Sequence, residues 1–420
     1  MSSWLEVQKT LVKDELIAEI DVETISLTRL GGYNARPYSW DLKLLTKPTA
    51  KSLKGVWRWW ARTAIVGAYN GKITYKEANE HLNKLFGSEK GGISEFTLDV
   101  SDVRLPKNYE EKLEKLKKQV LSKEEQRQLE RKLKEIPRIK LLLLSRKSQV
   151  SYEEVMLIPE GVKFRITIYG SKNFEKVNFA LSSFLLALVF GGIGSITRRA
   201  FGSLKISSFR FGDNLNVDPE LKKIVQDIQS KDFTENELRD TLKKLCEIAI
   251  KHALKLYEIS AVQQLQNQKT MPLVPSLSNI KIEVKKCSSV KLDEVGKVFL
   301  KQTWKGQKAN IRSSEFHTWI LGLPRCQQKQ GTGYFITTKL DPGRRISSIG
   351  VRYFRTKTKL FVVVFGLLSM DWPRDLLHIS KNKKEEMTPI PVNERKLQDA
   401  FDSAFETILK ILTKEGVVSK

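Results

Sequence analysis

Apolar and polar residues alternate along several stretches of the chain, and a period of two residues is typical of a half-buried β-strand. The first such stretch is Glu15 to Leu30, and the pattern returns at Ser94 to Val103 and Val162 to Tyr169. A strand is also expected at 139–144, and another at Leu204 to Phe211. The first half of the chain is therefore rich in predicted strands.

Helices are predicted between these strands, at 48–69, 75–86 and about 175–190. The segment 107–135 is highly charged with only a thin leucine stripe, which favours an inserted, peripheral helical hairpin. Without that insertion the order of elements is βαββαβ, the split arrangement of ferredoxin-like domains. The pattern therefore predicts one such domain in residues 1–212.

The turn at Gly212 to Asn214 is the predicted boundary with a second domain, residues 213–420. A chain of 420 residues exceeds the size at which one hydrophobic core usually stops growing. We therefore expect an α+β protein made of two tandem ferredoxin-like (RRM-like) domains. The second domain is predicted to contain helices at 219–229, 234–265, 291–302 and 393–413, and strands at 280–285, 349–355 and 359–367.

The charge of the chain is strongly unbalanced. Lys and Arg number 73 against 48 acidic residues, so 73 − 48 gives a net charge of +25. Such an excess repels itself unless a polyanion neutralises part of it, which favours nucleic acid as the partner. The alternative is a charged thermophilic surface, but that composition tends to balance its signs.

Cysteine usage and hydropathy indicate the compartment. Cys246, Cys287 and Cys326 are far apart and odd in number, which disfavours a disulfide framework and a zinc site with paired ligands. The longest apolar run, Phe179 to Ile193, is shorter than the roughly 20 residues of a spanning helix. The N-terminus carries no apolar stretch of signal-peptide length. We expect a cytoplasmic protein without a membrane partner.

The helix predicted at 48–69 carries Lys51, Lys54, Arg58 and Arg62 three or four residues apart, so these cations share one helix face. Ser52 and the exposed amides of the first turn add a potential anion site. We interpret this face as an RNA contact. An ordinary amphipathic helix with a basic solvated face remains the alternative.

A glycine-rich loop follows the apolar helix, at Gly191 to Leu204. A dinucleotide-binding fingerprint is disfavoured because Thr197 stands at the third glycine position and a helix, not a strand, precedes the loop. Glycines would let a phosphodiester backbone approach the main chain while arginines neutralise phosphates. A glycine-capped helix end with a basic turn is the alternative. The candidate RNA-binding residues here are Gly191, Gly192, Gly194, Ser195, Arg198 and Arg199.

The second half offers a similar combination of arginines and glycines. Arg325 lies beside a glycine-containing segment, and Arg344, Arg345 and Arg352 crowd one predicted strand and its approach. We interpret these four arginines as phosphate contacts. The neighbouring aromatic residues at 353–354 are expected to pack in the core.

No catalytic residue, metal site or cofactor is expected. A metal-independent ribonuclease needs a general base, most often histidine, and none of the four histidines lies in the basic helix or the glycine loop. Asp41 is the one carboxylate considered as a catalytic candidate, although an ion pair with a nearby lysine is favoured for it. The histidines are His81, His252, His317 and His378.

Several of these motifs together resemble the RAMP superfamily of CRISPR-associated proteins. They are SLKGVWRWWAR from Ser52, LFGS from Leu85, GGIGSITRRAFGSL from Gly191, and LGLP from Leu321 with RRIS from Arg344. Within the superfamily the chain is most similar to the first-named subunit of the Cmr module, the type III-B RNA-targeting effector. The matches occur in order over both halves of the chain.

The resemblance implies a non-catalytic, RNA-binding subunit near the 3′ end of the guide RNA that helps capture target RNA. It implies guide RNA, target RNA and other RAMP subunits as partners, and it assigns target cleavage to another subunit. Two alternatives remain open at this point. One is a RAMP-type endoribonuclease that processes guide precursors, and the other is a purely structural adaptor.

Overall fold

The computed structural model describes residues 15–30, 38–39, 44–45, 48–88, 92–107, 124, 158–259, 271–299, 318–323, 325–327, 332–336, 345–379 and 387–418. The helical hairpin predicted at 107–135 lies outside the described residues except for Lys107 and Glu124. The strand predicted at 139–144 lies outside them entirely.

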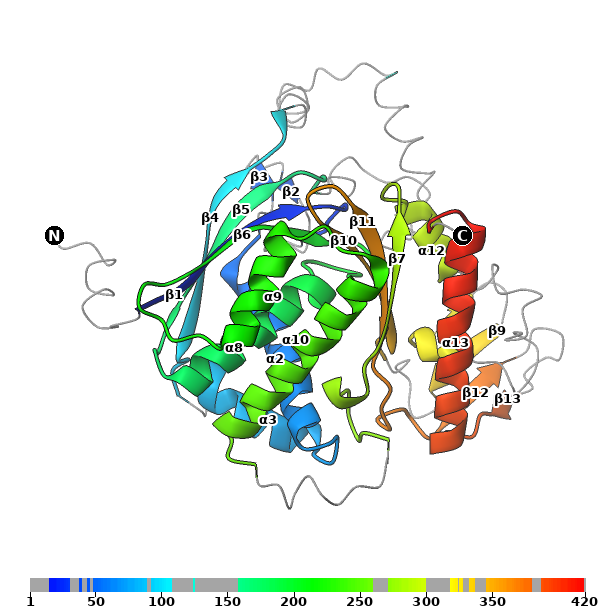
Figure 1. Cartoon of the computed structure of the whole chain (residues 1–420). Helices are drawn as coiled ribbons and strands as arrows, with labels where there is room; N and C mark the ends of the chain where they lie inside the picture. Colours follow the sequence, from blue (N-terminus) through cyan, green and yellow to red (C-terminus); the bar gives the residue numbers. More distant parts are fainter. Residues whose placement is uncertain are drawn as a thin grey trace.

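The first sheet is antiparallel and contains four strands in the order β4-β5-β1-β6 (Figure 1). Buried and half-buried residues alternate along β1, and Ile20 lies between Ile166 of β5 and Phe209 of β6. The period of two in the sequence therefore places one face of the sheet in the core. The strands are β1 (Glu15–Thr24), β4 (Phe96–Arg104), β5 (Lys163–Gly170) and β6 (Leu204–Phe211), and two short strands, β2 (Tyr38–Ser39) and β3 (Leu44–Leu45), pair separately.

Helices cover the buried face of this sheet (Figure 1). Helix α2 contacts α3, α8 and α10, and α10 also packs on α8. The indole nitrogen of Trp57 donates to the Ala180 carbonyl oxygen at 3.1 Å and to the Ser183 hydroxyl at 2.9 Å, which satisfies a polar group inside the core. These helices are α2 (Ala50–Ala68), α3 (Tyr75–Phe86), α8 (Phe174–Leu186), α9 (Pro219–Ser230) and α10 (Glu235–Leu256).

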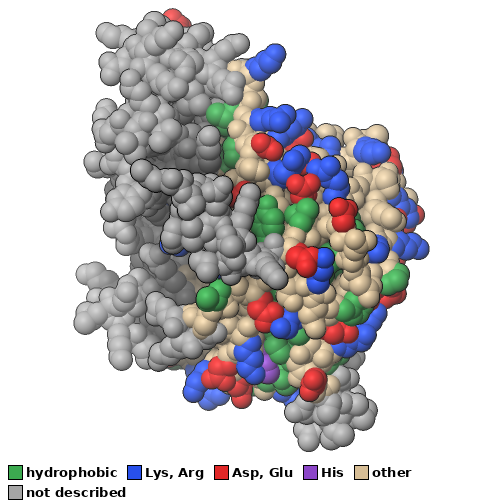
Figure 2. Space-filling view, turned by 90° about the vertical axis from the view of Figure 1, so that its left-hand side faces the viewer, with side chains coloured by type: hydrophobic (Ala, Val, Ile, Leu, Met, Phe, Trp, Pro, Cys, Tyr) green, Lys and Arg blue, Asp and Glu red, His purple; other side chains and the backbone are tan. Residues whose placement is uncertain are grey.

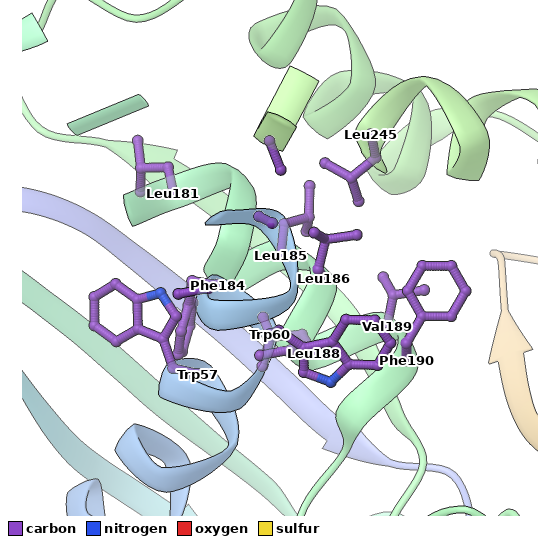
Figure 3. Packing of buried hydrophobic residues seen from close by; sticks show 14 of the residues in the cluster. Trp57, Trp60, Leu181, Phe184, Leu185, Leu186, Leu188, Val189, Phe190 and Leu245 are labelled. Carbon is purple, nitrogen blue, oxygen red and sulfur yellow. The ribbon is translucent and has the colours of Figure 1, made fainter. Parts of the chain in front are cut away.

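Helix α8 ends in a π-helical turn, η1 (Ala187–Gly191), and lies in the centre of the core. Figure 3 shows Phe184 beside Trp57 and Phe190 beside Trp60, with Leu245 of α10 above them. Among the described residues, Phe174–Gly191 is the one segment long and apolar enough to cross a membrane by length and composition. Here most of it is buried inside the protein.

The second sheet contains three antiparallel strands in the order β10-β11-β7. Strand β11 is buried on both faces, because Phe361 and Phe365 join the first hydrophobic cluster while Val362 and Val364 join a second. Helix α13 packs beyond this sheet (Figure 1). The elements are β7 (Lys281–Cys287), α12 (Leu292–Val298), β10 (Ile349–Arg355), β11 (Leu360–Gly366) and α13 (Glu394–Lys414). A smaller sheet has the order β13-β12-β9-β8, from β8 (Arg325–Gln327), β9 (Thr332–Ile336), β12 (Leu376–Ile379) and β13 (Met387–Pro389).

The predicted α+β class is confirmed, with two antiparallel sheets and helices packed on them. Among the described residues the order β1-α2-α3-β4-β5-α8-β6 follows the predicted one, and the further strand predicted at 139–144 stays untested. The boundary between residues 212 and 213 stays a prediction. Helices α9 and α10, which follow it, contribute to the same hydrophobic cluster as the first sheet.

We predict that Trp60→Ala lowers the free energy of unfolding by about 3–5 kcal/mol, because the fully packed indole would leave a cavity between the two sheets. Ile93→Ala is the control, since Ile93 is 92% exposed and should change stability by less than about 0.5 kcal/mol. Urea unfolding followed by circular dichroism measures both variants. Equal midpoints for the two variants would contradict the packing described.

Candidate nucleic-acid interface

The first turn of α2 is fixed by a capping box. The Thr49 side chain accepts from the Ser52 amide at 3.2 Å, and the Ser52 hydroxyl accepts from the Thr49 amide at 3.3 Å. Such reciprocal bonds satisfy amides that a helix start leaves unpaired. Ser52, predicted as an RNA contact, is therefore engaged in starting the helix.

The basic face of α2 lies partly against α3. Arg58 donates to the carbonyl oxygens of Phe86 and Gly87 at 3.1 and 2.9 Å, and to Asn83 Oδ1 at 2.7 Å. A cation at the end of a helix satisfies its last carbonyls and the negative end of its dipole. Arg58 therefore joins α2 to the C-terminal end of α3 while it remains half-buried.

Arg62 continues this contact one turn later. Its guanidinium donates to Asn79 Oδ1 at 3.1 Å and lies 5.1 Å from the centroid of the Tyr75 ring. Burial lowers the pKa of Arg62 from its usual value, as it does for Arg58. These two predicted RNA contacts also hold the helices together, which the spacing alone did not predict.

The two lysines of this face are more accessible. Lys51 is exposed, and Lys54 is half-buried with its ammonium 3.4 Å from the Phe96 carbonyl oxygen. Burial, and then the nearby cation Arg58, lowers the pKa of Lys54. A cation in such a position gains from a neighbouring anion more than a fully hydrated one does.

The first two glycines of the loop at 191–204 are buried, and protein atoms approach them. A Cβ atom on Gly191 would collide with Val56 and Trp60 of α2, and one on Gly192 would collide with the Arg352 guanidinium. The prediction that a phosphodiester backbone approaches these two glycines does not fit their burial. They are required because side chains of this protein pack against the main chain there.

The next two candidate residues, Gly194 and Ser195, are accessible to solvent. Gly194 has a φ of +86° and is exposed, as is Ser195, whose amide donates to the Arg29 carbonyl oxygen at 2.9 Å. The loop is thereby bonded to the segment after β1. Gly194 and Ser195 remain candidate RNA contacts.

Arg198 stacks on α2. Its guanidinium lies 4.8 Å from the centroid of the Trp59 ring and donates to the Ser347 carbonyl oxygen at 2.7 Å. Burial, and then the nearby cation Arg345, lowers the pKa of Arg198 to about 10, so it is still charged at neutral pH. The glycine loop and the basic helix are therefore in direct contact, through two residues that are 198 − 59 = 139 positions apart in sequence.

Arg199 lies on the other side of the loop. Its guanidinium is 5.3 Å from the centroid of the Phe299 ring, and burial lowers its pKa to about 10. The side chain is half-buried. Arg199 therefore remains a charged candidate for contact with phosphate.

Arg345 has an acidic partner, Asp371, to which it donates directly, and it stacks 5.0 Å from the centroid of the Trp372 ring. The hydroxyl of Tyr75 donates to the other oxygen of the same carboxylate at 2.8 Å. Burial, with Asp371 next, raises the pKa of Tyr75 to about 12. The charge of Arg345 is therefore already compensated within the protein.

The remaining arginines of the second half differ in placement. Arg352 is 0% exposed and donates to carbonyl oxygens of the glycine loop, so the direct RNA contact predicted for it does not fit the structure. Arg325 begins β8, and its side chain lies outside the described residues. Arg344 also lies outside them. The expected core packing of Tyr353 and Phe354 is confirmed, because both are buried.

Two histidines make structural contacts. His252 is fully buried, with Nδ1 3.1 Å from Glu175 Oε2 and Nε2 3.0 Å from Asp218 Oδ2. His81 Nε2 lies 2.9 Å from the Tyr69 hydroxyl, and burial lowers its pKa. In the part of the chain that the structure describes, no group of three or more His, Cys, Asp or Glu residues could hold a metal ion. His378 lies in β12, whereas His317 and Asp41 lie outside the described residues.

Two arginines of the first sheet have acidic partners, whereas the cations of α2 and the glycine loop have none among the described residues. On the outer face of the first sheet, Arg165 pairs with Asp21 at 2.8 Å and Arg210 with Glu19 at 2.9 Å. Figure 2, which views the molecule from the left-hand side of Figure 1, shows basic and acidic side chains intermixed on the described part of the surface. On α2 and the loop, by contrast, six cations have no carboxylate within ion-pair distance among the described residues: Lys51, Lys54, Arg58, Arg62, Arg198 and Arg199. We call these six residues the unpaired cationic surface.

The family comparison covers this same region. Residues 49–205 match the RAMP superfamily, from the cap of α2 to the start of β6. Over this segment the chain is similar to the RAMP superfamily. The matched segment contains the unpaired cationic surface, so the resemblance predicted from the motifs is confirmed where those residues lie.

Solved structures with a similar fold include chains of the Cmr-beta complex and the protein Cmr1. A chain of the type III-B Cmr-beta complex bound to cognate target RNA and AMPPnP has a TM-score of 0.59 and 16% identity, covering 94% of this chain and 100% of that one. Cmr1 from Pyrococcus furiosus in its apo form has a TM-score of 0.51 and 16% identity, covering 92% and 96%. A Cmr-beta complex bound to cognate target RNA gives 0.51 and 16%, covering 94% and 100%. At this identity the likeness concerns the fold, and among curated proteins no sequence matches the chain.

Three contributors to this site were not predicted. Trp59 stands in the basic helix and could have been considered as a stacking partner for Arg198. Tyr75 and Asp371 give no local signal, because they meet across 296 positions of sequence. Only the packing of α3 against the second half brings them together.

We predict that Asp371→Asn lowers the free energy of unfolding by about 1–3 kcal/mol, because Arg345 would lose its anionic partner in a mostly buried site. The matched control is Asp402→Asn, since Asp402 pairs with Lys281 at an exposed position, and its loss should be about 0–1 kcal/mol. Urea unfolding measures the free energy of unfolding of both variants, provided that its dependence on urea concentration stays the same as in the wild type. Equal losses in the two variants would contradict the role of Asp371.

Proposed function

We propose that this chain is a non-catalytic, RNA-binding subunit of a type III-B CRISPR effector complex of the Cmr type. The observation that carries the proposal is the unpaired cationic surface on α2 and the glycine loop. Half-buried cations without acidic partners are costly unless an external polyanion neutralises them. A ribose-phosphate strand supplies such a polyanion.

The geometry suits a nucleic-acid strand better than a small anion. The cations extend from Lys51 at the start of α2, along the helix, to Arg199 in the loop. Trp59 is half-buried beside Arg198 and offers an aromatic ring near the same surface. In our proposal these groups contact the RNA backbone, while base pairing between guide and target supplies sequence specificity.

The similar folds support a more specific role. The Cmr-beta chains were solved in complexes bound to cognate target RNA. We propose that this chain works in the cytoplasm with guide RNA, target RNA and other RAMP subunits, near the 3′ end of the guide, where it helps capture target RNA. We also propose that its two halves are tandem ferredoxin-like domains; the strand order of the first sheet supports this for the first half.

We predict that Lys51→Gln and Arg199→Gln each weaken binding of single-stranded RNA and make its salt dependence shallower. Each lost phosphate contact should reduce the slope of log K against log salt by about 0.7. Fluorescence anisotropy across a salt series measures this for the full chain and for the chain assembled with its partner subunits.

Arg210→Gln is the matched control, because Arg210 is exposed but already paired with Glu19. It should leave both affinity and slope close to those of the wild type. A purely structural adaptor would show no change in RNA binding for any of the three variants. That result would refute the proposal.

We further predict no cleavage of guide precursor RNA by the purified chain, with or without a chelator. The two histidines with described contacts are engaged by Tyr69, Glu175 and Asp218, which gives them structural partners. Gel analysis of labelled RNA over several hours tests this. Turnover that disappears in His81→Ala or Asp41→Ala would favour the endoribonuclease alternative instead.

A further inference from the structure

The glycine loop is held in a conformation that side chains disfavour. Ile196 and Ala200 have φ values of +59° and +67°, in the left-handed region. Residues with a side chain rarely adopt this conformation, and a β-branched residue such as Ile196 is a genuine outlier there. A strained backbone of this kind persists only where the surrounding structure fixes it.

Arg352 of β10 supplies much of that constraint. Its Nη1 donates to the carbonyl oxygens of Thr197 and Phe201 at 3.0 and 2.6 Å, and its Nη2 donates to that of Gly202 at 2.7 Å. The side chain is 0% exposed, and the position of the guanidinium requires glycine at 192. Three charge-assisted bonds therefore connect one strand of the second sheet to the loop.

Backbone bonds next to Arg352 complete the joint. The Ala200 amide donates to the Val351 carbonyl oxygen at 2.8 Å, and the Val351 amide donates to the Arg198 carbonyl oxygen at 2.9 Å. Strand β10 is at the edge of its sheet, so its open side receives the loop as a short parallel bridge. The loop is thus attached to the second sheet through both main chain and side chain.

An arginine is an unusual choice for a position with a purely packing role. A buried charge without a counterion is costly, and apolar residues of similar volume usually give more stable cores. Burial lowers the pKa of Arg352 to about 9, which leaves it protonated at neutral pH. Its Nη1 and Nη2 groups donate to carbonyl oxygens of the loop, and the loop contains Arg198 and Arg199.

We infer that Arg352 is a positioning residue, which holds the glycine loop from the second half of the chain so that Gly194, Ser195 and Arg199 meet RNA. It acts through the loop and does not touch RNA itself. This inference rests on the proposed RNA-binding function. It makes the affinity for RNA depend on a contact between the two halves.

The experiment compares Arg352→Met and Arg352→Lys with the control Arg355→Met in the full chain. Arg355 lies three residues further along β10 and is half-buried, and the alternation of strand residues places it on the opposite face. The first readout is amide hydrogen exchange without RNA, at the loop amides of Ile193, Ser195 and Gly202. The second is RNA affinity across a salt series, below the melting temperature of every variant.

In Arg352→Met we expect loop exchange to accelerate about tenfold or more and RNA affinity to fall about tenfold, with the salt slope unchanged. Arg352→Lys should show intermediate values, because an ammonium can replace some of the bonds to carbonyl oxygens. The Arg355→Met control should match the wild type in both readouts. Should Arg352→Met fail to fold, Arg352→Lys alone still tests the inference through the same readouts.

The inference would be overturned if Arg352→Met and Arg352→Lys left amide hydrogen exchange in the loop unchanged. It would also be overturned if loop exchange accelerated while RNA affinity stayed the same. A salt slope reduced by about 0.7 would also overturn it, because it would indicate a direct phosphate contact by Arg352. If the wild-type chain fails to bind RNA, the proposed function fails. The exchange data then still report separately whether Arg352 holds the loop.

Discussion

A three-ring aromatic contact determines where the candidate site is placed. Trp60 of α2 stacks on Phe190 at 5.2 Å between centroids (Figure 3), and both rings meet Phe365 of β11 at 5.8 and 5.1 Å. The contact joins a helix of the first half, the end of the central apolar helix and a strand of the second sheet. Because the glycine loop begins directly after Phe190, its first residue is fixed between the two sheets.

Close contacts restrict the backbone of the glycine loop beyond this first residue. Gly191 packs against α2, and Arg352 occupies the space beside Gly192. Gly202 lies so close to the main chain of Ile193 that a Cβ atom there would collide with the Ile193 carbonyl oxygen. The loop then carries Arg198 onto Trp59, which places it beside the basic face of α2. A surface of cations without acids is therefore assembled from two segments that tight packing brings together. Glycine is needed at 191, 192 and 202 because atoms of this protein pack tightly against the main chain there, and not because the main chain is open to a ligand.

The outer face of the first sheet differs from the unpaired cationic surface in the partners of its arginines. On the outer face of the sheet, Arg165 and Arg210 are paired across strands with Asp21 and Glu19. In many RNA-binding domains with a four-stranded sheet, aromatic side chains on that face stack on bases. Here the outer face carries the ion pairs of Arg165 and Arg210, whereas the unpaired cationic surface lies on α2 and the loop.

Local patterns in the sequence predicted the elements well, because alternation, caps and glycines are local signals. The predicted bounds of α3 and β6 match the structure, and capping residues start α2 at the expected place. What could not be predicted depends on distant contacts. The spacing of Arg58 showed a shared helix face but not that α3 covers part of it. The burial of Arg352 follows from acceptors about 150 residues away, which no local pattern reveals.

Ultraviolet cross-linking of the full chain to RNA, followed by mass spectrometry of the linked peptides, tests the central claim most directly. The account predicts cross-links in the peptides that contain residues 51–62 and 194–199, on α2 and in the glycine loop. Cross-links confined to the strands of the first sheet, with none in those two peptides, would contradict it.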